Sequence, residues 1–295
     1  MNIQAWWIAS RPKTLIVSIA PVLLGVSLAF HNEVFSSYLV GIFTLISALM
    51  IQIGTNLIND LYDFIKGADT SNRIGPTRVV QSGMLSKRQV KFGAFVCFLI
   101  AFIIGVYLVM QGGRPILLIG SLAIVSGYCY TAGPYPLGYN GFGDLFVFIF
   151  FGLIAVPGTY YLQSGGSLFN IDSILIGSSI GCIAVAILCV NNIRDINEDM
   201  QAGKKTLAVR FGSNFVSNLY KTMISLPYIF IVILFFRESF FWNLSLCLLL
   251  LSIPIAVKLI IDINKIHGSE LNYLLIRTSN FMRLFFVLLF LGIIL

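Results

Sequence analysis

The chain has 295 residues, of which 58% are hydrophobic and only 11% are charged. Soluble globular domains carry about 25% charged residues and about 45–50% apolar ones. This composition therefore excludes a soluble globule, a nucleic-acid-binding module and a secreted disulfide scaffold. The formal net charge of +7 would indicate acidic partners in a soluble protein, but in a membrane protein it is first a signal of orientation.

Nine apolar stretches are candidate membrane-spanning helices, since a spanning helix needs about 20 apolar residues. In chain order they cover residues 14–30, 38–62, 92–110, 115–131, 142–162, 172–191, 215–236, 240–261 and 279–295. We therefore predict an all-α, polytopic membrane protein in which about nine transmembrane helices form one bundle. No stretch is left for a large extramembrane domain, so residues 1–295 are predicted to form a single intramembrane domain.

The basic residues indicate how these helices are oriented. If the N-terminus is cytoplasmic and the nine spans alternate, all of the 19 lysines and arginines except Arg114 and Arg237 lie at the cytoplasmic side. Cytoplasmic loops carry an excess of Lys and Arg. The sequence therefore predicts a multi-pass protein of the cell membrane with its N-terminus inside and its C-terminus outside.

Two of the predicted inner connections, residues 63–91 and 192–214, are long, polar and rich in both signs of charge. Long loops in a compact fold are usually functional or disordered. The first follows Asn59, Asp60 and Asp63, which share one helical face because they are spaced by three or four residues. The predicted activity therefore lies at the cytoplasmic face.

The second inner connection follows a similar acidic row. Asn191, Asp195 and Asp199 are spaced by four residues and would form one row on a continuous helix. Asp63 and Asp199 have four predicted helices between equivalent points, and a glycine, basic residues and a threonine follow each row. This pattern indicates a weak internal duplication.

Oxygen ligands without His or Cys nearby favour a hard cation. Magnesium typically takes one or two carboxylates and completes its shell with water and substrate phosphates, and basic side chains suit those phosphates. A single acidic turn at a helix exit is usually a solvated surface, but two matched rows on one side of the membrane favour a shared site. We therefore predict a site for a metal-bridged pyrophosphate.

These residues resemble the two aspartate-rich motifs of the UbiA superfamily of intramembrane prenyltransferases, approximately N-D-x-x-D and D-x-x-x-D. The motifs fall on residues 59–63 and 195–199, and nine helices with the motifs after the second and sixth is that family's layout. Further stretches look like the 1,4-dihydroxy-2-naphthoate polyprenyltransferase branch, namely residues 10–14, 67–70, 75–83, 130–139, 156–161 and 203–212. Several superfamily members have a third aspartate at the position of Gly67, whereas here the next aspartate is Asp69.

The resemblance implies roles for individual residues. Mg²⁺ would be held by Asn59, Asp63, Asp195 and Asp199, which would be the catalytic set, with Asp60 as a further metal-site residue. The diphosphate would be bound by Lys66, Arg73, Arg78, Lys204 and Lys205. The remaining candidates for substrate contacts are Arg11, Asp69, Tyr130, Asp144 and Asn191: Arg11 for an acceptor carboxylate, Tyr130 for the allylic cation and Asp144 for an acceptor hydroxyl.

The implied activity transfers a polyprenyl group from an allylic polyprenyl diphosphate to 1,4-dihydroxy-2-naphthoate. Pyrophosphate and carbon dioxide leave, and demethylmenaquinol forms in menaquinone biosynthesis. No protein partner is indicated. The alternatives are another aromatic acceptor, 4-hydroxybenzoate or haem, and, from a different class, a cation-coupled transporter. Transporters place ionisable residues near the bilayer midplane, whereas the acids here cluster at predicted helix ends.

Overall fold

A computed structural model describes residues 2–69, 74–165, 170–237 and 246–295. Regular structure in these ranges is helical throughout, as the composition predicts. The N-terminal half contains α1 (Ile3–Ser10), η1 (Pro12–Thr14), α2 (Ile16–His31), α3 (Tyr38–Ile65) and α4 (Lys87–Cys129). The rest contains η2 (Gly138–Asn140), α5 (Gly143–Val147), η3 (Phe148–Ile154), α6 (Ala155–Ser164), α7 (Ile171–Arg194), α8 (Ile196–Gln201), α9 (Leu207–Phe235), η4 (Cys247–Ser252), α11 (Ile253–Asp262), η5 (Gly268–Glu270) and α12 (Leu271–Ile294).

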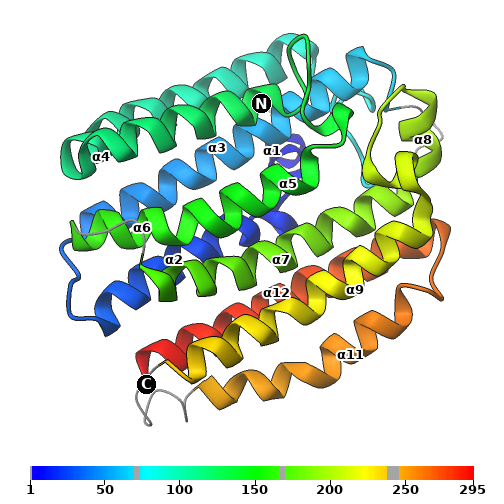
Figure 1. Cartoon of the computed structure of the whole chain (residues 1–295). Coiled ribbons are helices and arrows are strands. Elements are labelled where there is room, and N and C mark those ends of the chain that lie inside the picture. The colour runs from blue at the N-terminus through cyan, green and yellow to red at the C-terminus, as the bar shows by residue number, and fades with distance from the viewer. Residues whose placement is uncertain (1, 70–73, 166–169, 238–245) are drawn as a thin grey trace.

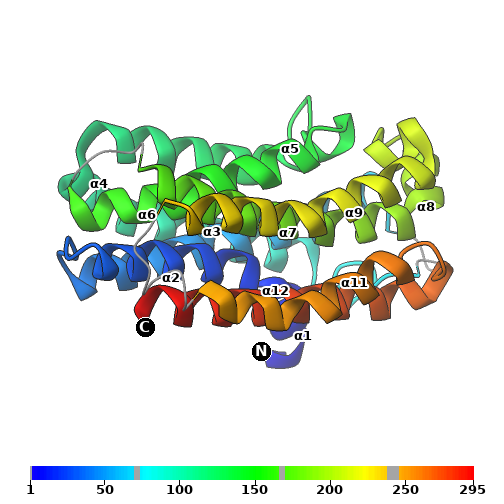
Figure 2. The same ribbon diagram turned by 60° about the horizontal axis from the view of Figure 1, so that its bottom comes forward.

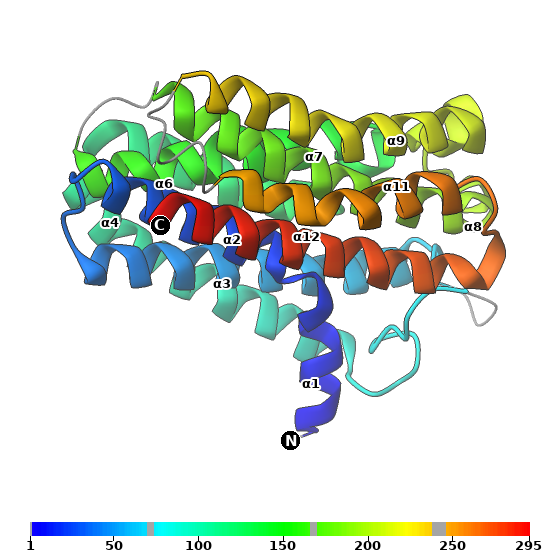
Figure 3. The ribbon, with the colours of Figure 1, turned by 90° about the horizontal axis from the view of Figure 1, so that it is seen from below.

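The long helices run side by side in one bundle, and the short helix α8 lies at the end opposite the C-terminus (Figures 1 and 2). Helix α1 stands away from the bundle at a steep angle to the long helices (Figure 3). The chain bends by 56° between the α1–η1 segment and α2. Arg11, at this bend, adopts a left-handed conformation with φ +54°.

Six helices in the described ranges are long and apolar enough to cross a membrane, and counting the bent α1–α2 pair gives seven. The chain is therefore an integral membrane protein, although the predicted count of nine is not confirmed. Two predicted spans, 92–110 and 115–131, both lie in α4, whose halves fold back on each other at Gly113 (Figure 1). Gly113 has φ +67° and ψ −152°, a conformation that glycine adopts without steric cost.

Two other boundaries differ from the prediction. The predicted span 240–261 begins outside the described residues, and its described part is η4 followed by α11. The predicted span 279–295 starts too late, because α12 already begins at Leu271. The turns that the prediction left out contain Arg277, which forms an ion pair with Asp262 of α11.

Helix α7 forms the centre of the bundle. In its most apolar stretch 83% of the residues are buried, against 17% in α3 and in α4. Small residues allow this packing. Because lipid tails are as apolar as the side chains, helices in a membrane associate through close packing of their backbones and not through the hydrophobic effect. A methyl group on Gly177 would lie 2.3 Å from the carbonyl oxygen of Gly152, so η3, a π-helical segment, is seated directly against α7.

The two helices that carry the acidic motifs have equivalent neighbours. Helix α3 packs mainly on α4, and α7 packs mainly on α9. In each half the motif-bearing helix therefore pairs with the next long helix in the chain, as an internal duplication predicts. Both α3 and α7 end beside the loops that surround α8 (Figure 1), which brings the two motifs to one end of the bundle.

Candidate active site

A cavity of about 1500 Å³ lies between α2, α3, α4, η3 and α7. At the end of the bundle near α8 it is lined by charged groups from the ends of α3 and α7. Farther along α4 its wall becomes apolar, with Val106, Met110, Ile116 and Leu117 next to the reversal at Gly113. The cavity therefore joins a charged mouth to a long apolar channel inside the membrane region.

Five side chains meet at this mouth, and we call them the mouth cluster: Asp63, Arg78, Tyr139, Asp199 and Lys204. Lys204 Nζ lies 3.1 Å from Asp63 Oδ1 and 3.2 Å from Asp199 Oδ1. Tyr139 donates a 2.9 Å hydrogen bond to Asp63 Oδ1, and Arg78 Nη2 donates a 3.3 Å bond to Asp63 Oδ2. The two motifs, far apart in the sequence, are thus brought together through one ammonium group.

The charges in the mouth cluster depend on one another. Burial disfavours the charged form of Lys204, but Asp63 and Asp199 outweigh it and raise the pKa of Lys204 above its ordinary value. Burial raises the pKa of Asp199 to about 6, although Lys204 acts in the opposite direction. Burial beside Asp63 also raises the pKa of Tyr139, so its hydroxyl keeps the proton that it donates.

The loop of residues 74–86 closes one side of the mouth, and Asp60 anchors it. Both carboxylate oxygens of Asp60 accept backbone N–H bonds, at 3.1 Å from Val79 and 3.0 Å from Val80. Asp60 is 2% exposed and does not line the cavity. The structure therefore places this predicted metal-site residue behind the mouth, where it positions the loop that carries Arg78.

Arg78 has a free donor inside the mouth. Its guanidinium lies 3.3 Å from Asp63 and 3.3 Å from Asp69, so Asp69 faces a protein cation. The Nη1 atom of Arg78 is buried and has no hydrogen-bond partner among the described residues. Buried donors are normally paired, and a phosphate oxygen would pair this one.

The second acidic row is not continuous. Helix α7 ends at Arg194 and α8 begins at Ile196, so the chain leaves the helix at Asp195. Arg194 donates two bonds to the Asp195 carboxylate, at 2.6 and 2.7 Å, and a third to Asn272 of α12 at 3.0 Å. Asp199 reaches the mouth cluster from the short α8 instead. The predicted i, i+4, i+8 row was therefore wrong as a helical face, although all three residues line the cavity.

The other predicted residues fall into two groups. Arg11 donates a 3.3 Å bond to Asn59 Oδ1, and both line the cavity with Asn191 and Tyr130. Lys66 lies 4.2 Å above the Tyr139 ring and donates to the Thr131 carbonyl oxygen at 2.8 Å. Lys66 is not among the residues that line the cavity, and neither are Lys205, which is exposed, and Asp144, which is buried near Cys189. Arg73 lies outside the described residues.

Three residues of this end of the bundle were missed from the sequence. Tyr139 holds Asp63, and its ring also lies 4.8 Å from Lys204 Nζ. Arg194 and Asn272 connect α7 to α12, and Asn272 also donates to the carbonyl oxygen of Ile74 in loop 74–86. Tyr139 lies in the stretch 130–139, which resembles the family, but nothing in the local sequence distinguishes it from Tyr130 and Tyr135.

The sequence profile of the UbiA prenyltransferase family matches residues 18–294. The chain belongs to this family. It is 39% identical over 221 residues to the 1,4-dihydroxy-2-naphthoate octaprenyltransferase of Haemophilus influenzae, which covers 72% of this chain and 70% of that protein. The Bacillus subtilis protein of the same name is 38% identical over 231 residues, covering 78% and 73%. The family predicted from the two aspartate motifs is confirmed.

Solved structures of UbiA homologues share the fold of this family member. The homologue from Archaeoglobus fulgidus bound to GPP and Mg²⁺ has a TM-score of 0.68 at 16% identity, covering 98% of this chain and 99% of that one. The apo homologue from Aeropyrum pernix K1 also has a TM-score of 0.68, at 14% identity, covering 91% and 95%. The all-helical UbiA-like bundle is therefore confirmed.

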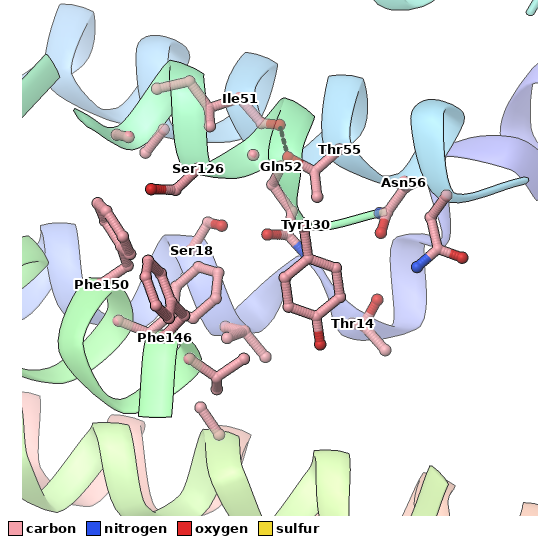
Figure 4. Close-up of a pocket in the computed structure, with 18 of the residues that line it drawn as sticks. Thr14, Ser18, Ile51, Gln52, Thr55, Asn56, Ser126, Tyr130, Phe146 and Phe150 are labelled. Atoms are coloured by element: carbon pink, nitrogen blue, oxygen red, sulfur yellow. Dashed lines mark hydrogen bonds between the residues drawn. The ribbon is translucent and has the colours of Figure 1, made fainter. Parts of the chain in front are cut away.

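In this UbiA family member the wall of the cavity beyond the mouth is mixed in character. Figure 4 shows Tyr130, Phe146 and Phe150 bordering the same space as Ser18, Gln52 and Ser126. Gly143 leaves room for the tyrosine, since a methyl group there would lie 2.8 Å from the Tyr130 hydroxyl oxygen. Between the charged mouth and the apolar channel lies an intermediate zone of aromatic faces and polar groups.

Proposed function

We propose that this chain transfers a polyprenyl group from an allylic polyprenyl diphosphate to 1,4-dihydroxy-2-naphthoate. The carbon–oxygen bond to the diphosphate breaks, and a new carbon–carbon bond forms at the ring carbon that bears the carboxylate. Carbon dioxide then leaves, its bonding electrons return to the ring, and demethylmenaquinol forms in menaquinone biosynthesis. One observation carries the proposal: a single cavity joins an acidic and basic mouth to an apolar channel.

The names of the relatives support the acceptor. Five relatives between 35% and 39% identical are called 1,4-dihydroxy-2-naphthoate octaprenyltransferase, and each covers more than two thirds of this chain. These matches favour the naphthoate branch over a 4-hydroxybenzoate or haem acceptor. The charged groups that line the cavity lie at helix ends and in the connections, not at mid-span. This placement favours an enzyme over a cation-coupled transporter.

The donors at the mouth fit Mg²⁺. Within the described ranges no three His, Cys, Asp or Glu side chains gather closely enough to hold a metal by themselves. Magnesium, however, commonly uses one or two carboxylates and takes its remaining ligands from water and substrate phosphates. Asp63 and Asp199 both lie within 3.2 Å of one cation, Lys204 Nζ, so two carboxylates already converge. A Mg²⁺ bound here would neutralise charge on the departing pyrophosphate.

Asp63 and Asp199 are the principal metal ligands in this proposal, with Asn59, Asn191 and Asp195 as further oxygen donors around the same mouth. Asn59 accepts from Arg11, and Asp195 is bound by Arg194, so neither is as directly placed as the first two. Asp60 acts indirectly by holding loop 74–86. Asp69 acts through Arg78, whose Nε it faces.

The cations of the mouth bind the diphosphate. The raised pKa of Lys204 keeps its ammonium group charged, and Arg78 has a buried Nη1 without a partner among the described residues, so both can donate to phosphate oxygens. Lys66 does not line the cavity, but its ammonium group lies over the Tyr139 ring of the mouth cluster, so it is the nearby cation that completes this group. Preorganised donors that stabilise charge on a leaving group act most strongly in the transition state. Lys205 and Asp144 lie outside the cavity and are not assigned to substrate.

The allylic cation forms between the mouth and the apolar channel. Aromatic faces stabilise a cation, and Tyr130 and Phe146 line that part of the cavity. The apolar wall excludes water, which would otherwise convert the cation to an alcohol. Arg11, at the mouth beside Asn59, receives the acceptor carboxylate.

The proposed domain comprises residues 1–295, lying in the cell membrane with the mouth at the cytoplasmic face. The excess of Lys and Arg in the connections at that side supports this orientation. The C-terminus lies at the end of the bundle opposite α8 (Figure 1), which agrees with a cytoplasmic mouth and an outer C-terminus.

The test supplies membranes that contain the protein with Mg²⁺, a short prenyl diphosphate and a panel of aromatic acids. Mass spectrometry then identifies the product. We expect a prenylated naphthalenediol without its carboxylate, formed only when Mg²⁺ is present. A prenylated 4-hydroxybenzoate or haem product without any naphthoate product would contradict the proposed acceptor, and ion uptake without prenyl transfer would contradict the enzyme class.

A further inference from the structure

A polar stripe runs along α3 inside the cavity. Seven side chains at helical spacing share this face and line the cavity: Thr44, Ser47, Gln52, Thr55, Asn56, Asn59 and Asp63. Gln52 lies seven residues before Asn59, which corresponds to about 10 Å along a helix. The stripe therefore carries polar groups well beyond the metal and diphosphate site, into the part of the cavity that a prenyl tail would otherwise fill.

Most side chains of the stripe already form hydrogen bonds with other parts of the protein. Thr44 and Thr55 donate to the carbonyl oxygens of Val40 and Ile51, each at 2.8 Å. Asn56 donates to Ser10 at 3.0 Å, Ser47 to Ala101 at 3.4 Å, and Asn59 accepts from Arg11. Gln52 makes no side-chain hydrogen bond to the described part of the chain. Both the oxygen and the nitrogen of its amide are therefore left for a ligand, whereas each of the other members has at least one group engaged by the protein.

A second polar group without a hydrogen-bond partner among the described residues comes from α2. Ser18 is 2% exposed, and its Oγ has no hydrogen-bond partner among the described residues. A buried hydroxyl in an apolar surrounding costs free energy unless it is paired. Ser18 lines the cavity, and Figure 4 shows Ser18 and Gln52 projecting into the space that Tyr130, Phe146 and Phe150 border.

We propose that Ser18 and Gln52 bind the ring hydroxyl groups of the acceptor and so determine which aromatic acid the enzyme accepts. This inference rests on the proposed function, because it names contacts for the acceptor of that reaction. A prenyl tail has no group that needs these donors and acceptors, and the diphosphate is bound by the mouth cluster. A dihydroxylated aromatic ring is the reactant whose hydroxyl groups match the unpaired Ser18 hydroxyl and the Gln52 amide, which lie beside the aromatic faces of Tyr130 and Phe146.

The position also suits the reaction. The ring lies between the aromatic faces of Tyr130 and Phe146, with its carboxylate directed to Arg11 at the mouth. This places the carbon that bears the carboxylate toward the diphosphate, where the allylic carbon is released. Ser18 and Gln52 then hold the rest of the ring, so they are binding residues for the acceptor and take no part in breaking the diphosphate bond.

The experiment compares Ser18→Ala and Gln52→Met with the wild-type protein in membranes, using 1,4-dihydroxy-2-naphthoate, a prenyl diphosphate and Mg²⁺. We expect each variant to raise the KM for the naphthoate about tenfold, the effect of losing one hydrogen bond to a ligand. The KM for the prenyl diphosphate stays unchanged, which also shows that the variant is folded. Thr222→Val, whose hydroxyl bonds to the Asn218 carbonyl oxygen of its own helix outside the cavity, is the control and leaves both constants unchanged.

A second arm uses 2-naphthoate, which lacks both hydroxyl groups, as a competitive inhibitor. Its inhibition constant is expected to be the same in the wild-type protein and in the two variants. An unchanged naphthoate KM in both variants, or an equal rise in the KM for the diphosphate, would overturn this inference alone. Failure of the wild-type protein to prenylate any naphthoate would instead overturn the proposed function, before a variant is measured.

Discussion

The two acidic motifs look alike in the sequence but have different surroundings in the structure. Asp63, at the end of α3, contacts three partners: Arg78, Tyr139 and Lys204. In the second motif Arg194 neutralises Asp195 directly, and within the mouth cluster Asp199 forms its ion pair with Lys204. One half of the duplicated pattern therefore anchors the site, whereas the other half contributes a carboxylate whose charge is less fully compensated.

This difference explains how one carboxylate of the site can be held in a fixed position while the other can still bind a further cation. Arg78, Tyr139 and Lys204 come from three different segments of the chain and together fix Asp63, so it sets the geometry of the mouth. Burial raises the pKa of Asp199 to about 6, which means that a further positive charge beside it would be favourable. A metal-bridged diphosphate brings such charge. The two motifs thus supply one ligand with a fixed position, Asp63, and one whose negative charge is less fully neutralised, Asp199. The following variants test this difference.

The largest effect is expected from removing either carboxylate charge. Asp63→Asn and Asp199→Asn keep the side-chain size but lose the charge that holds the metal, so turnover with saturating Mg²⁺ falls at least about 10³-fold. Prenyl transfer in membranes measures it. Asp172→Asn is the control. Asp172 lies in the first turn of α7, at the end of that helix away from the mouth, where it forms an ion pair with Arg237. Full turnover in either mouth variant would refute the assigned site.

Two adjacent lysines give the next comparison. Lys204 lies between the two carboxylates, whereas the side chain of Lys205 is exposed and outside the cavity. Lys204→Gln should lower kcat about 10²-fold, because it removes a charge that stabilises the departing pyrophosphate. Lys205→Gln should change kcat less than twofold. Equal losses in the two variants would show that general basicity of this loop, not the position of Lys204, matters.

A smaller effect is expected at Tyr139. Tyr139→Phe removes the hydrogen bond to Asp63 but keeps the ring that faces Lys66 and Lys204. A hydrogen bond to a charged group contributes about 1.5–3 kcal/mol, so kcat/KM for the diphosphate should fall by about one to two orders of magnitude. Steady-state kinetics measure this change. A loss as large as that of Asp63→Asn would mean that the hydroxyl itself takes part in the reaction.

The smallest effect is expected behind the mouth. Asp60→Asn keeps one of the two acceptors that bind Val79 and Val80, so loop 74–86 is held less firmly. The KM for the diphosphate should rise about threefold to tenfold, and limited proteolysis should cleave this loop faster. Lost Mg²⁺ dependence in this variant would instead indicate that Asp60 is a metal ligand, as the motif alone suggests.

The sequence predicts the features that depend on local composition. Hydropathy locates the helices, and the charges of residues 59–63 and 195–199 locate the functional end of the bundle. The reversal at Gly113 was also correctly placed between two predicted spans. These predictions succeed because length, apolar content and helical spacing are properties of a single segment.

Contacts between distant segments were beyond the same reasoning. Asp60 and Asp63 belong to one motif, yet one binds loop 74–86 and the other faces the cavity. Lys204 and Lys205 are equivalent in any local pattern, and only the path of the chain after α8 separates them. The unpaired state of Ser18 likewise depends on which atoms of other helices surround it, so no spacing rule could have identified it.

The most direct test of the central claim measures binding without chemistry. Calorimetry with a prenyl thiolodiphosphate, whose bridging sulfur slows ionisation, determines its affinity for the purified protein with and without Mg²⁺. Our account predicts tight binding to the wild-type protein only with Mg²⁺, and weak, Mg²⁺-independent binding to Asp63→Asn and to Asp199→Asn. Wild-type, Mg²⁺-dependent affinity in either variant would contradict the claim that these two carboxylates hold the metal and its diphosphate.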